Sequence, residues 1–402
     1  MRRTVFLLSL ALAGAMAQPT LAACPGTSTC RRPVGCPKGS VIVSAGQSIQ
    51  SAINAVACSA TICVKPGTYP GLIDFKGKKI NLVSSNGPAV TILNGGGAGP
   101  VVSFKTAEGP GSILDGFKVM NGKFPTGGGI YISNASPTIR HCIIQKNVAA
   151  TTSSNSFPRG GGVWVGGASA KPVITCTRFL GNHADYAGGG LLTAGSADPY
   201  LRLDHFEGNT APYGGGIAAY SHGRLDVGTT LFLSNQATGD GGGIHAGVVY
   251  GNVLVRQCWF KGNRAGGSGG GMWIPAGLAQ VLNNTFDGNQ AAVGGGIAAG
   301  HGGMVDVAST IFVNNTGVAL VNTQPVGSNT SVVNHYNDFF NNSGGTFLDT
   351  YGDLDPLLVD PQLNACCPVP GSPVIDAGIP DPLFNDPNGT RNDMGACGGP
   401  AI

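Results

Sequence analysis

The sequence predicts an all-β protein, a single-stranded right-handed parallel β-helix with a short N-terminal capping helix and an irregular C-terminal cap. Glycine makes up 67 of the 402 residues but does not fall at every third position, which excludes collagen. The chain is 42% hydrophobic and only 11% charged, which argues against disorder. Two short motifs recur through the middle of the chain at a spacing of about 27 residues, which indicates a repeat architecture.

Residues 1–23 are typical of an export signal, because a positively charged start precedes an apolar run from Val5 to Ala17. This run is too short to span a membrane as a stable helix. Two processing routes stay open. An ordinary signal peptidase would release a soluble protein, whereas Leu21-Ala22-Ala23-Cys24 resembles a lipobox that would place a lipid on Cys24. We expect a secreted protein or one attached to the outer membrane or cell surface, with no transmembrane segment in its mature form.

The 11 cysteines fit an oxidising compartment, and most lie near the two ends of the chain. We expect disulfides to staple the N-terminal segment 24–46 and the C-terminal cap, with Cys58 and Cys63 as a local pair. Cys142 and Cys258 stand at matching repeat positions four coils apart, so we expect buried thiols that do not bridge to each other. No metal site is expected at the cysteines, because no histidine accompanies them at finger-like spacing.

The first repeated motif is a Gly-Gly-Gly triplet followed by an aliphatic residue, and the second is Phe-x-x-Asn. The triplets begin at Gly127, Gly160, Gly188, Gly214, Gly241, Gly269 and Gly294. The asparagines of the second motif, with Asn147 from a variant first copy, are Asn147, Asn182, Asn209, Asn235, Asn263, Asn289, Asn315 and Asn342. A period of about 27 is too short for a two-helix repeat, and the short segments between turns are rich in Val, Ile, Thr and Phe. Each repeat is therefore predicted to be one coil of short strands.

Stacked coils place equivalent residues above one another at a strand spacing of about 4.8 Å. The phenylalanines then form a continuous core column and the asparagines form a ladder of bonded amides. The glycine triplets supply turns with positive φ. Residues 47–57 predict a short amphipathic helix that caps the first coil, with Ile49, Ile53 and Val56 on one face. The β-helix is expected over residues 47–345, this helix included, and the Pro/Asp/Cys-containing cap over 346–402.

These motifs resemble the repeats of the chlamydial polymorphic outer membrane proteins and, more broadly, the right-handed β-helix repeat proteins of the pectate-lyase-like superfamily. The start, Ser48-Ile49-Gln50-Ser51-Ala52-Ile53 followed by Pro66-Gly67-Thr68-Tyr69, and the ending, Ser372-Pro373-Val374-Ile375-Asp376-Ala377-Gly378, are also similar to that fold. The resemblance covers residues 41–397 and implies the fold. It implies little about function, because one fold hosts many functions.

A lyase of that superfamily would need a basic residue and carboxylates for cations, and a hydrolase would need paired carboxylates. Glutamate is nearly absent from the chain. The best polar cluster is Asp204 and His205 with Arg202, near Arg159 or Asp185 in earlier coils, and these three residues are weak catalytic candidates. Asp226 and Asp306 occupy equivalent positions three coils apart, too far to share a site, and are expected to be solvated turn residues.

The second residue after each glycine triplet is predicted to point outward, because the preceding aliphatic residue points inward. At this position Tyr131 and Trp164 would be stacked neighbours, and so would His245 and Trp273. Exposed aromatic steps suit the apolar faces of sugar rings, so these four residues are the candidate ligand-binding column. The alternative is that a loop covers them or that they stabilise the sheet surface by cross-strand pairing.

The net charge of +3, with no Lys/Arg run, argues against a nucleic acid partner. No cofactor is expected. Residues 386–393 offer oxygen ligands for Ca²⁺ but lack the EF-hand pattern, so a structural turn is preferred. We expect a non-catalytic protein that binds extracellular polysaccharide or mediates adhesion. A polysaccharide lyase or glycoside hydrolase is the alternative, and a passive structural spacer is the second alternative; the oligomeric state stays open.

Overall fold

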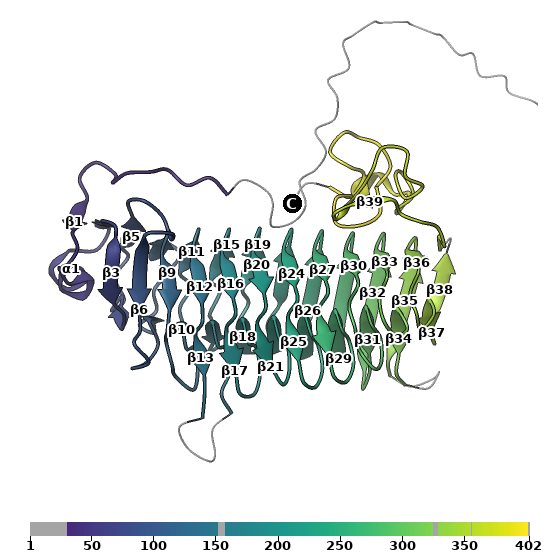
Figure 1. Cartoon of the computed structure of the whole chain (residues 1–402), viewed down its shortest axis with the longest axis horizontal. Coiled ribbons are helices and arrows are strands. Elements are labelled where there is room, and N and C mark those ends of the chain that lie inside the picture. The colour runs from purple at the N-terminus through teal and green to yellow at the C-terminus, as the bar shows by residue number, and fades with distance from the viewer. Residues whose placement is uncertain (1–29, 152–156, 325–328, 355, 401–402) are drawn as a thin grey trace, which may run out of the picture.

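The computed structural model describes residues 30–400 except 152–156, 325–328 and 355, and the expected export signal and Cys24 lie outside this part. The described chain winds into a right-handed parallel β-helix, a row of stacked coils that runs the length of the molecule (Figure 1). The predicted fold class is therefore confirmed. Within the described residues, no helix is both long enough and apolar enough to cross a membrane.

Each coil has three faces, which we name first, second and third in chain order. The first face follows the glycine triplets, and its strands are β4 (Ile73–Asp74), β7 (Val102–Phe104), β10 (Ile130–Ser133), β14 (Val163–Gly166), β18 (Leu191–Gly195), β22 (Ile217–Ser221), β31 (Ile297–Ala299), β34 (Leu320–Asn322) and β37 (Phe347–Leu348). The second face consists of β1 (Val41–Val43), β2 (Thr61–Val64), β5 (Asn81–Ser84), β8 (Ile113–Asp115), β11 (Thr138–Arg140), β15 (Val173–Thr175), β19 (Tyr200–Arg202), β23 (Leu225–Gly228), β32 (Gly303–Ala308), β35 (Ser331–His335) and β38 (Tyr351–Leu354). Two long strands, β26 (Ile244–Arg256) and β29 (Met272–Leu282), pair on both faces and join them into one 22-stranded sheet.

The third face is a separate 11-stranded sheet that carries the Phe-x-x-Asn motif. Its strands are β3 (Gly67–Pro70), β6 (Thr91–Asn94), β9 (Lys118–Met120), β12 (Ile143–Gln145), β16 (Arg178–Leu180), β20 (His205–Glu207), β24 (Leu231–Leu233), β27 (Trp259–Lys261), β30 (Thr285–Asp287), β33 (Ile311–Val313) and β36 (Asp338–Phe340). A short five-stranded sheet leads back to the triplets and contains β13 (Val148–Ala149), β17 (His183–Ala184), β21 (Thr210–Ala211), β25 (Gln236–Ala237) and β28 (Arg264–Ala265).

The core is built from inward columns, as the repeat predicts. The phenylalanines of the third face are in register from one coil to the next and stack with ring centroids 4.2 to 5.1 Å apart. The aliphatic residues after the glycine triplets are fully buried beside them. This continuous apolar interior replaces the single compact core of a globular domain, since each coil buries its apolar side chains against its neighbours.

The asparagine ladder forms from Asn147 to Asn342. Each side-chain amide donates to a main-chain carbonyl of the preceding coil, and each except that of Asn342 also donates to the next asparagine. For example, Asn209 Nδ2 lies 2.9 Å from Asn235 Oδ1 and 2.9 Å from the Phe179 carbonyl oxygen. The backbone N–H of Asn209 also donates to Asn235 Oδ1. Because these buried amides are bonded on both sides, the ladder avoids the cost of unsatisfied polar groups.

The glycine triplets are needed for two reasons. The first glycine of each triplet has a positive φ, for example +67° at Gly188. The second and third lie so close to the next coil that a side chain would collide with its backbone. A Cβ atom on Gly189 would lie 2.5 Å from the Thr210 carbonyl oxygen and 2.6 Å from that of Gly215. Positive φ was the reason predicted from the sequence, and close approach is the second.

The N-terminal cap is the helix α1 (Ile49–Ala55), which begins after Ser48, whose side chain accepts from the Ser51 N–H. Ile49 and Ile53 are buried against the first coil and Val56 packs beside them, as expected. The solenoid itself runs on through β37 and β38 to Leu354, beyond the expected boundary at residue 345.

The C-terminal segment differs from the expected end cap, because it folds back along the side of the solenoid (Figure 1). It contains the antiparallel pair β39 (Leu363–Asn364) and β40 (Cys367–Pro368) and the short 3-10 helix η1 (Pro382–Phe384). It bonds to the turns between the second and third faces, including Gln257 and Asn283. We call residues 356–400 the C-terminal flap.

Candidate functional site

Tyr131 and Trp164 form the aromatic pair that the sequence predicts. They lie opposite each other on β10 and β14, and both are partly exposed. Their rings are stacked, with centroids 4.9 Å apart and planes 7° from parallel. Phe124 packs edge-on against Tyr131. The first face therefore carries a partly exposed stack of two rings at this end.

The next two positions of the outward column are aliphatic, and aromatic residues from elsewhere in the coils cover them. Leu192 and Ala218 are fully buried although they point outward, because Tyr186, Tyr213 and Tyr220 pack over them. The ring of Tyr186 lies 5.6 Å from that of Tyr213 and 6.5 Å from that of Tyr220. We call Tyr131, Trp164, Tyr186, Tyr213 and Tyr220 the aromatic track. It crosses four coils, a length of about 14 Å at the strand spacing.

His245 and Trp273 are register neighbours as predicted, but they are not exposed. Each has only 7% of its surface accessible. The edges of Tyr213 and Tyr220 cover His245, with centroids 5.5 and 5.2 Å away, and His301 packs beside Trp273. Burial lowers the pKa of His245 to about 4, so its imidazole is neutral at pH 7. His245 supports the far end of the track from beneath, whereas Trp273 packs with Ala298 and Val321 on later coils. The expectation of an exposed pair is corrected.

The centre of the track combines ring faces with hydrogen-bonding groups. Burial, together with Tyr186 and Tyr213, raises the pKa of Tyr220, so its hydroxyl stays protonated and able to donate. The Arg159 guanidinium lies 5.5 Å from the Tyr186 ring centroid, within cation–π range. Asp240 acts electrostatically on both Tyr220 and His245. Such a surface offers apolar faces and polar edges to a ligand.

The three weak catalytic candidates from the sequence point in different directions. Arg202 lies on the outside of the second face, where it pairs with Asp226. Asp204 is fully buried inside the solenoid. His205 lies on the third face beside Arg178 and Glu207, and burial lowers its pKa to about 4. Arg159 lies beside Tyr186 of the aromatic track, and Asp185 pairs with His183. The structure therefore does not assemble the expected polar cluster.

Asp204 belongs to a second buried ladder, which the sequence did not reveal. Its members follow the positive-φ turn between the second and third faces and are Cys142, Thr177, Asp204, Thr230, Cys258, Asn284, Thr310 and Asn337. Side-chain oxygens accept backbone N–H groups of the previous coil, as where Asp204 Oδ1 lies 2.8 Å from the Thr177 nitrogen. Cys142 and Cys258 are buried free thiols at these positions, as predicted. The mixture of small polar residue types hides this column from a motif search.

A cluster of three arginines around Asp226 was also not predicted. Asp226, expected to be a solvated turn residue, lies in β23 and is only 7% exposed. Arg202 and Arg224 contact its two oxygens at 2.6 and 2.8 Å, and Arg256 lies 3.8 Å away. Asp306, at the equivalent position three coils on, instead pairs with His335 at 2.7 Å beside a groove on β29, β32 and β35. The expectation that these two aspartates cannot share a site is met.

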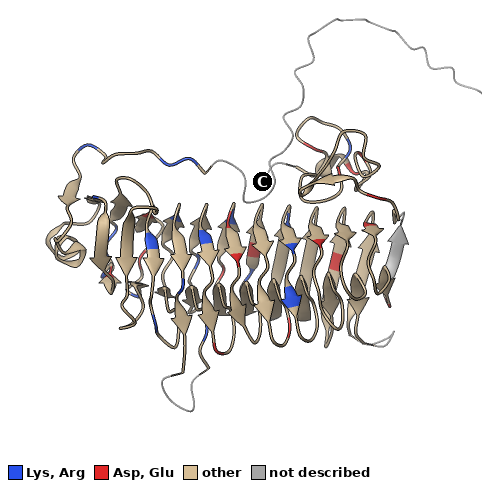
Figure 2. Ribbon diagram, viewed as in Figure 1, with Lys and Arg blue, Asp and Glu red and all other residues tan. Residues whose placement is uncertain are grey.

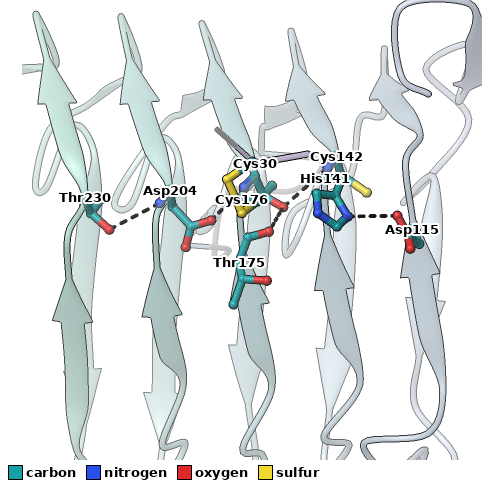
Figure 3. Close-up of a disulfide and its surroundings, with 9 residues drawn as sticks. Cys30, Asp115, His141, Cys142, Thr175, Cys176, Asp204 and Thr230 are labelled. Carbon is teal, nitrogen blue, oxygen red and sulfur yellow. Dashed lines mark hydrogen bonds and ion pairs between the residues drawn. A yellow bond between two sulfur atoms is a disulfide. The ribbon is translucent and has the colours of Figure 1, made fainter. Parts of the chain in front are cut away.

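The N-terminal residues 30–36, which we call the strap, lie along the same edge as the C-terminal flap. The Cys30–Cys176 disulfide fixes the strap beside the buried ladder (Figure 3). Asp115 binds Arg32 of the strap at 2.8 Å, and also Arg140 and His141. Cys36 pairs with Cys63 and Cys58 is free, so the expected Cys58–Cys63 pair is wrong. A pocket of about 260 Å³ lies between the strap and the turns.

The C-terminal flap brings three carboxylates together. One oxygen each of Asp376, Asp386 and Asp393 lie within 4.8 Å of one another. Burial and the neighbouring Asp393 raise the pKa of Asp386 to about 6. Both oxygens of Asp386 already accept backbone N–H groups, from Gly399 and Asp393. This use agrees with the structural turn expected from the sequence, and Ca²⁺ stays the alternative to it.

In the view of Figure 2, Lys and Arg positions and Asp and Glu positions are interspersed along the coils of the described chain. The arginine cluster and the strap contacts are local exceptions to this pattern.

Residues 123–316 match the model of the right-handed beta helix region. This match agrees with the right-handed parallel β-helix fold that the coils show. Among solved structures, the catalytic unit of a thermostable GH87 alpha-1,3-glucanase from Streptomyces thermodiastaticus is similar, with 14% sequence identity and a TM-score of 0.35 over 82% of this chain and 72% of that chain. Similarity of this degree says nothing about the ligand of the present chain. A search of curated proteins found no match.

Proposed function

We propose that this β-helix protein binds extracellular polysaccharide, or mediates adhesion through it, without cleaving it. The observation that carries the proposal is the stacked, partly exposed pair of Tyr131 and Trp164 at the start of the aromatic track. A sugar ring has an apolar face that packs on an aromatic ring, and its hydroxyl groups bond to polar edges such as the tyrosine hydroxyls. Tyr186, Tyr213 and Tyr220 extend this surface along the direction in which the coils stack.

The proposal favours binding over hydrolysis because the track lacks the usual catalytic arrangement. Hydrolysis of a glycosidic bond ordinarily uses two carboxylates about 5 to 9.5 Å apart across the bond. Asp240 acts electrostatically on both His245 and Tyr220, while Asp185, next to Tyr186 in the sequence, is bonded to His183 and Thr151. His245 is neutral and covered, so it is poorly placed to exchange protons with a substrate.

The test is binding of a panel of neutral polysaccharides to the immobilised protein and to Trp164→Ala and Tyr131→Ala variants. Each substitution is expected to weaken binding about tenfold, the equivalent of about 1.4 kcal/mol. The matched control is Leu278→Ala, which removes an exposed apolar side chain on the second-face part of β29. Thermal unfolding of each variant checks that the fold is retained.

The same samples are assayed for new reducing ends and for unsaturated products. Release of either would replace the proposal with a glycoside hydrolase or a polysaccharide lyase. Binding that is equal in the wild-type protein and both track variants would reject the track. No binding to any polysaccharide would favour the structural spacer.

We also propose that the protein is exported, either free or as a lipoprotein modified on Cys24. This proposal rests on the sequence of residues 1–23. Mass spectrometry of the mature N-terminus tests it. Processing that is blocked by globomycin would identify the lipoprotein, and an unprocessed N-terminus would reject export by this signal.

A further inference from the structure

The three arginines around Asp226 lie on the outside of the second face, apart from the aromatic track. Arg202 projects from β19, Asp226 from β23 and Arg256 from β26, on three successive coils. Arg224 comes directly before β23 and reaches the same carboxylate. Asp226 and Arg202 are 7% and 5% exposed, whereas the side chains of Arg224 and Arg256 are 48% and 30% accessible. The cluster is therefore anchored at its base and open at its rim.

Positive charge exceeds negative charge in this cluster. Three guanidinium groups surround one carboxylate, which leaves two positive charges without a counter-ion among the contacts that join these four residues. Burial and the neighbouring Arg202 lower the pKa of Arg256, as expected where like charges are held close together. An added anion would relieve this repulsion.

Hydrogen-bond donors are also in excess. The Nε atoms of Arg202 and Arg256 are buried and have no hydrogen-bond partner among the described residues. The terminal nitrogens of Arg202 donate to the Asp226 carboxylate and to the carbonyl oxygen of Leu201. The Arg202 guanidinium also lies 3.9 Å from the centroid of the Tyr200 ring. A group of arginines that served only to bind Asp226 would need fewer donors, since one carboxylate is satisfied by a single bidentate guanidinium.

We propose that Arg202, Arg224 and Arg256, oriented by Asp226, form an oxyanion-binding site for a sulfate or carboxylate group on an acidic polysaccharide. Guanidinium groups bind both oxyanions through paired, charge-assisted hydrogen bonds. The surface beside the cluster is open, with a partly exposed Tyr200, and a groove of about 330 Å³ begins at Asn252 and Val253 of β26. This open setting suits a charged group carried on an extended chain. The site is independent of the proposed binding of neutral sugars on the first face.

The test measures the affinity of the full-length mature protein for sulfated dextran, polygalacturonate and uncharged dextran at several salt concentrations. The test variant is Arg224→Gln/Arg256→Gln, which removes the two accessible arginines and leaves the buried Arg202 in place. The matched control is Arg178→Gln/Arg264→Gln, which removes the same charge from exposed positions on the third face and the short sheet. Thermal unfolding confirms that both variants fold.

We expect the wild-type protein to bind at least one polyanion more tightly than uncharged dextran, with affinity that falls as salt rises. The Arg224→Gln/Arg256→Gln variant should bind that polyanion about tenfold more weakly, and the control variant should bind it about as well as the wild type. Preference for sulfated dextran would identify sulfate as the ligand group, and preference for polygalacturonate would identify carboxylate.

Equal losses in both double variants would overturn the proposal, because binding would then follow net charge and not this site. No binding of either polyanion by the wild-type protein would overturn it as well. A negative result with neutral polysaccharides would not affect the proposed oxyanion site, because that assay tests the aromatic track on the first face.

Discussion

Replacing Asp204 with asparagine should stabilise the protein at neutral pH. Asp204 is fully buried, and burial raises the pKa of its carboxyl well above the usual range. Its Oδ1 accepts the Thr177 N–H, but Oδ2 is buried without a partner. At the equivalent place, the side chain of Asn284 donates to two carbonyls, those of Val255 and Leu282, each at 3.0 Å. An Asp204 carboxyl can make such a donation only when it is protonated.

The magnitude follows from the proton that folding requires. The unfolded chain releases this proton near pH 4, whereas the native protein retains it up to the raised pKa. Stability of the wild-type protein therefore falls by about 1.4 kcal/mol for each pH unit between these two values. Asparagine does not titrate, so the advantage of Asp204→Asn should grow at this rate above pH 4 and be small at pH 3.

The assay is the midpoint of thermal and urea unfolding of both proteins from pH 3 to pH 8. The reverse substitution in the same ladder, Asn284→Asp, is the matched variant and should lose stability as pH rises. A constant difference between Asp204→Asn and the wild-type protein at all pH values would refute the reasoning. So would a variant that is less stable than the wild type at pH 7.

Three further predictions concern stability. Gly189→Ala should cost about 3 kcal/mol because its Cβ would lie 2.5 Å from the Thr210 carbonyl oxygen; Gly181→Ala, with positive φ but nothing within 4 Å, should cost only about 1 kcal/mol in urea unfolding. Asn235→Ala should cost about 2–3 kcal/mol, measured in the same way, because it leaves the buried Asn209 amide with one acceptor fewer. Burial raises the pKa of Asp115, but hydrogen bonds from His141 and Arg32 and the charge of Arg140 outweigh it and lower the pKa to about 2. The ionised Asp115 carboxylate should contribute about 1–2 kcal/mol to the free energy of unfolding above pH 4, and this contribution is lost as the pH falls through 2. The difference in melting temperature between Asp115→Asn and the wild-type protein should therefore shrink from pH 4 to pH 2. If it does not shrink, this charge does not stabilise the strap.

The parts of the fold that were predictable are those in which one residue type recurs at one position. The Phe column, the Asn ladder and the glycine turns each repeat a single letter, so their period and their inward orientation follow from the sequence. The second ladder has the same geometry but tolerates Cys, Thr, Asp or Asn, since each can accept or donate at that turn. A column of mixed residue types produces no repeated motif in the sequence, so the sequence predicted matching buried positions only for its two cysteines.

The candidate site was predictable only in part, for a different reason. Strand alternation correctly gives the outward direction of Tyr131, Trp164 and His245. It does not show what covers them, because Tyr213 and Tyr220 reach His245 from the turn before the triplet and from the end of the strand. The arginine cluster also depends on side chains that converge from coils of unequal length. The Cys30–Cys176 disulfide joins residues 146 apart, a pairing that no local spacing indicates.

The strap and the flap change how this solenoid should lose order. In a repeat protein each coil contacts only its neighbours, so fraying ordinarily starts at the terminal coils. Here the strap is covalently attached at Cys176, and the flap is bonded to Gln257 and Asn283. Both terminal regions are thus fastened to coils well inside the stack. The flap also packs on Leu231, just after the turn at Thr229, so the turn at Leu203 lies between the two attachments. We expect heat or tension to separate one coil from the next first at this place, in the middle of the molecule.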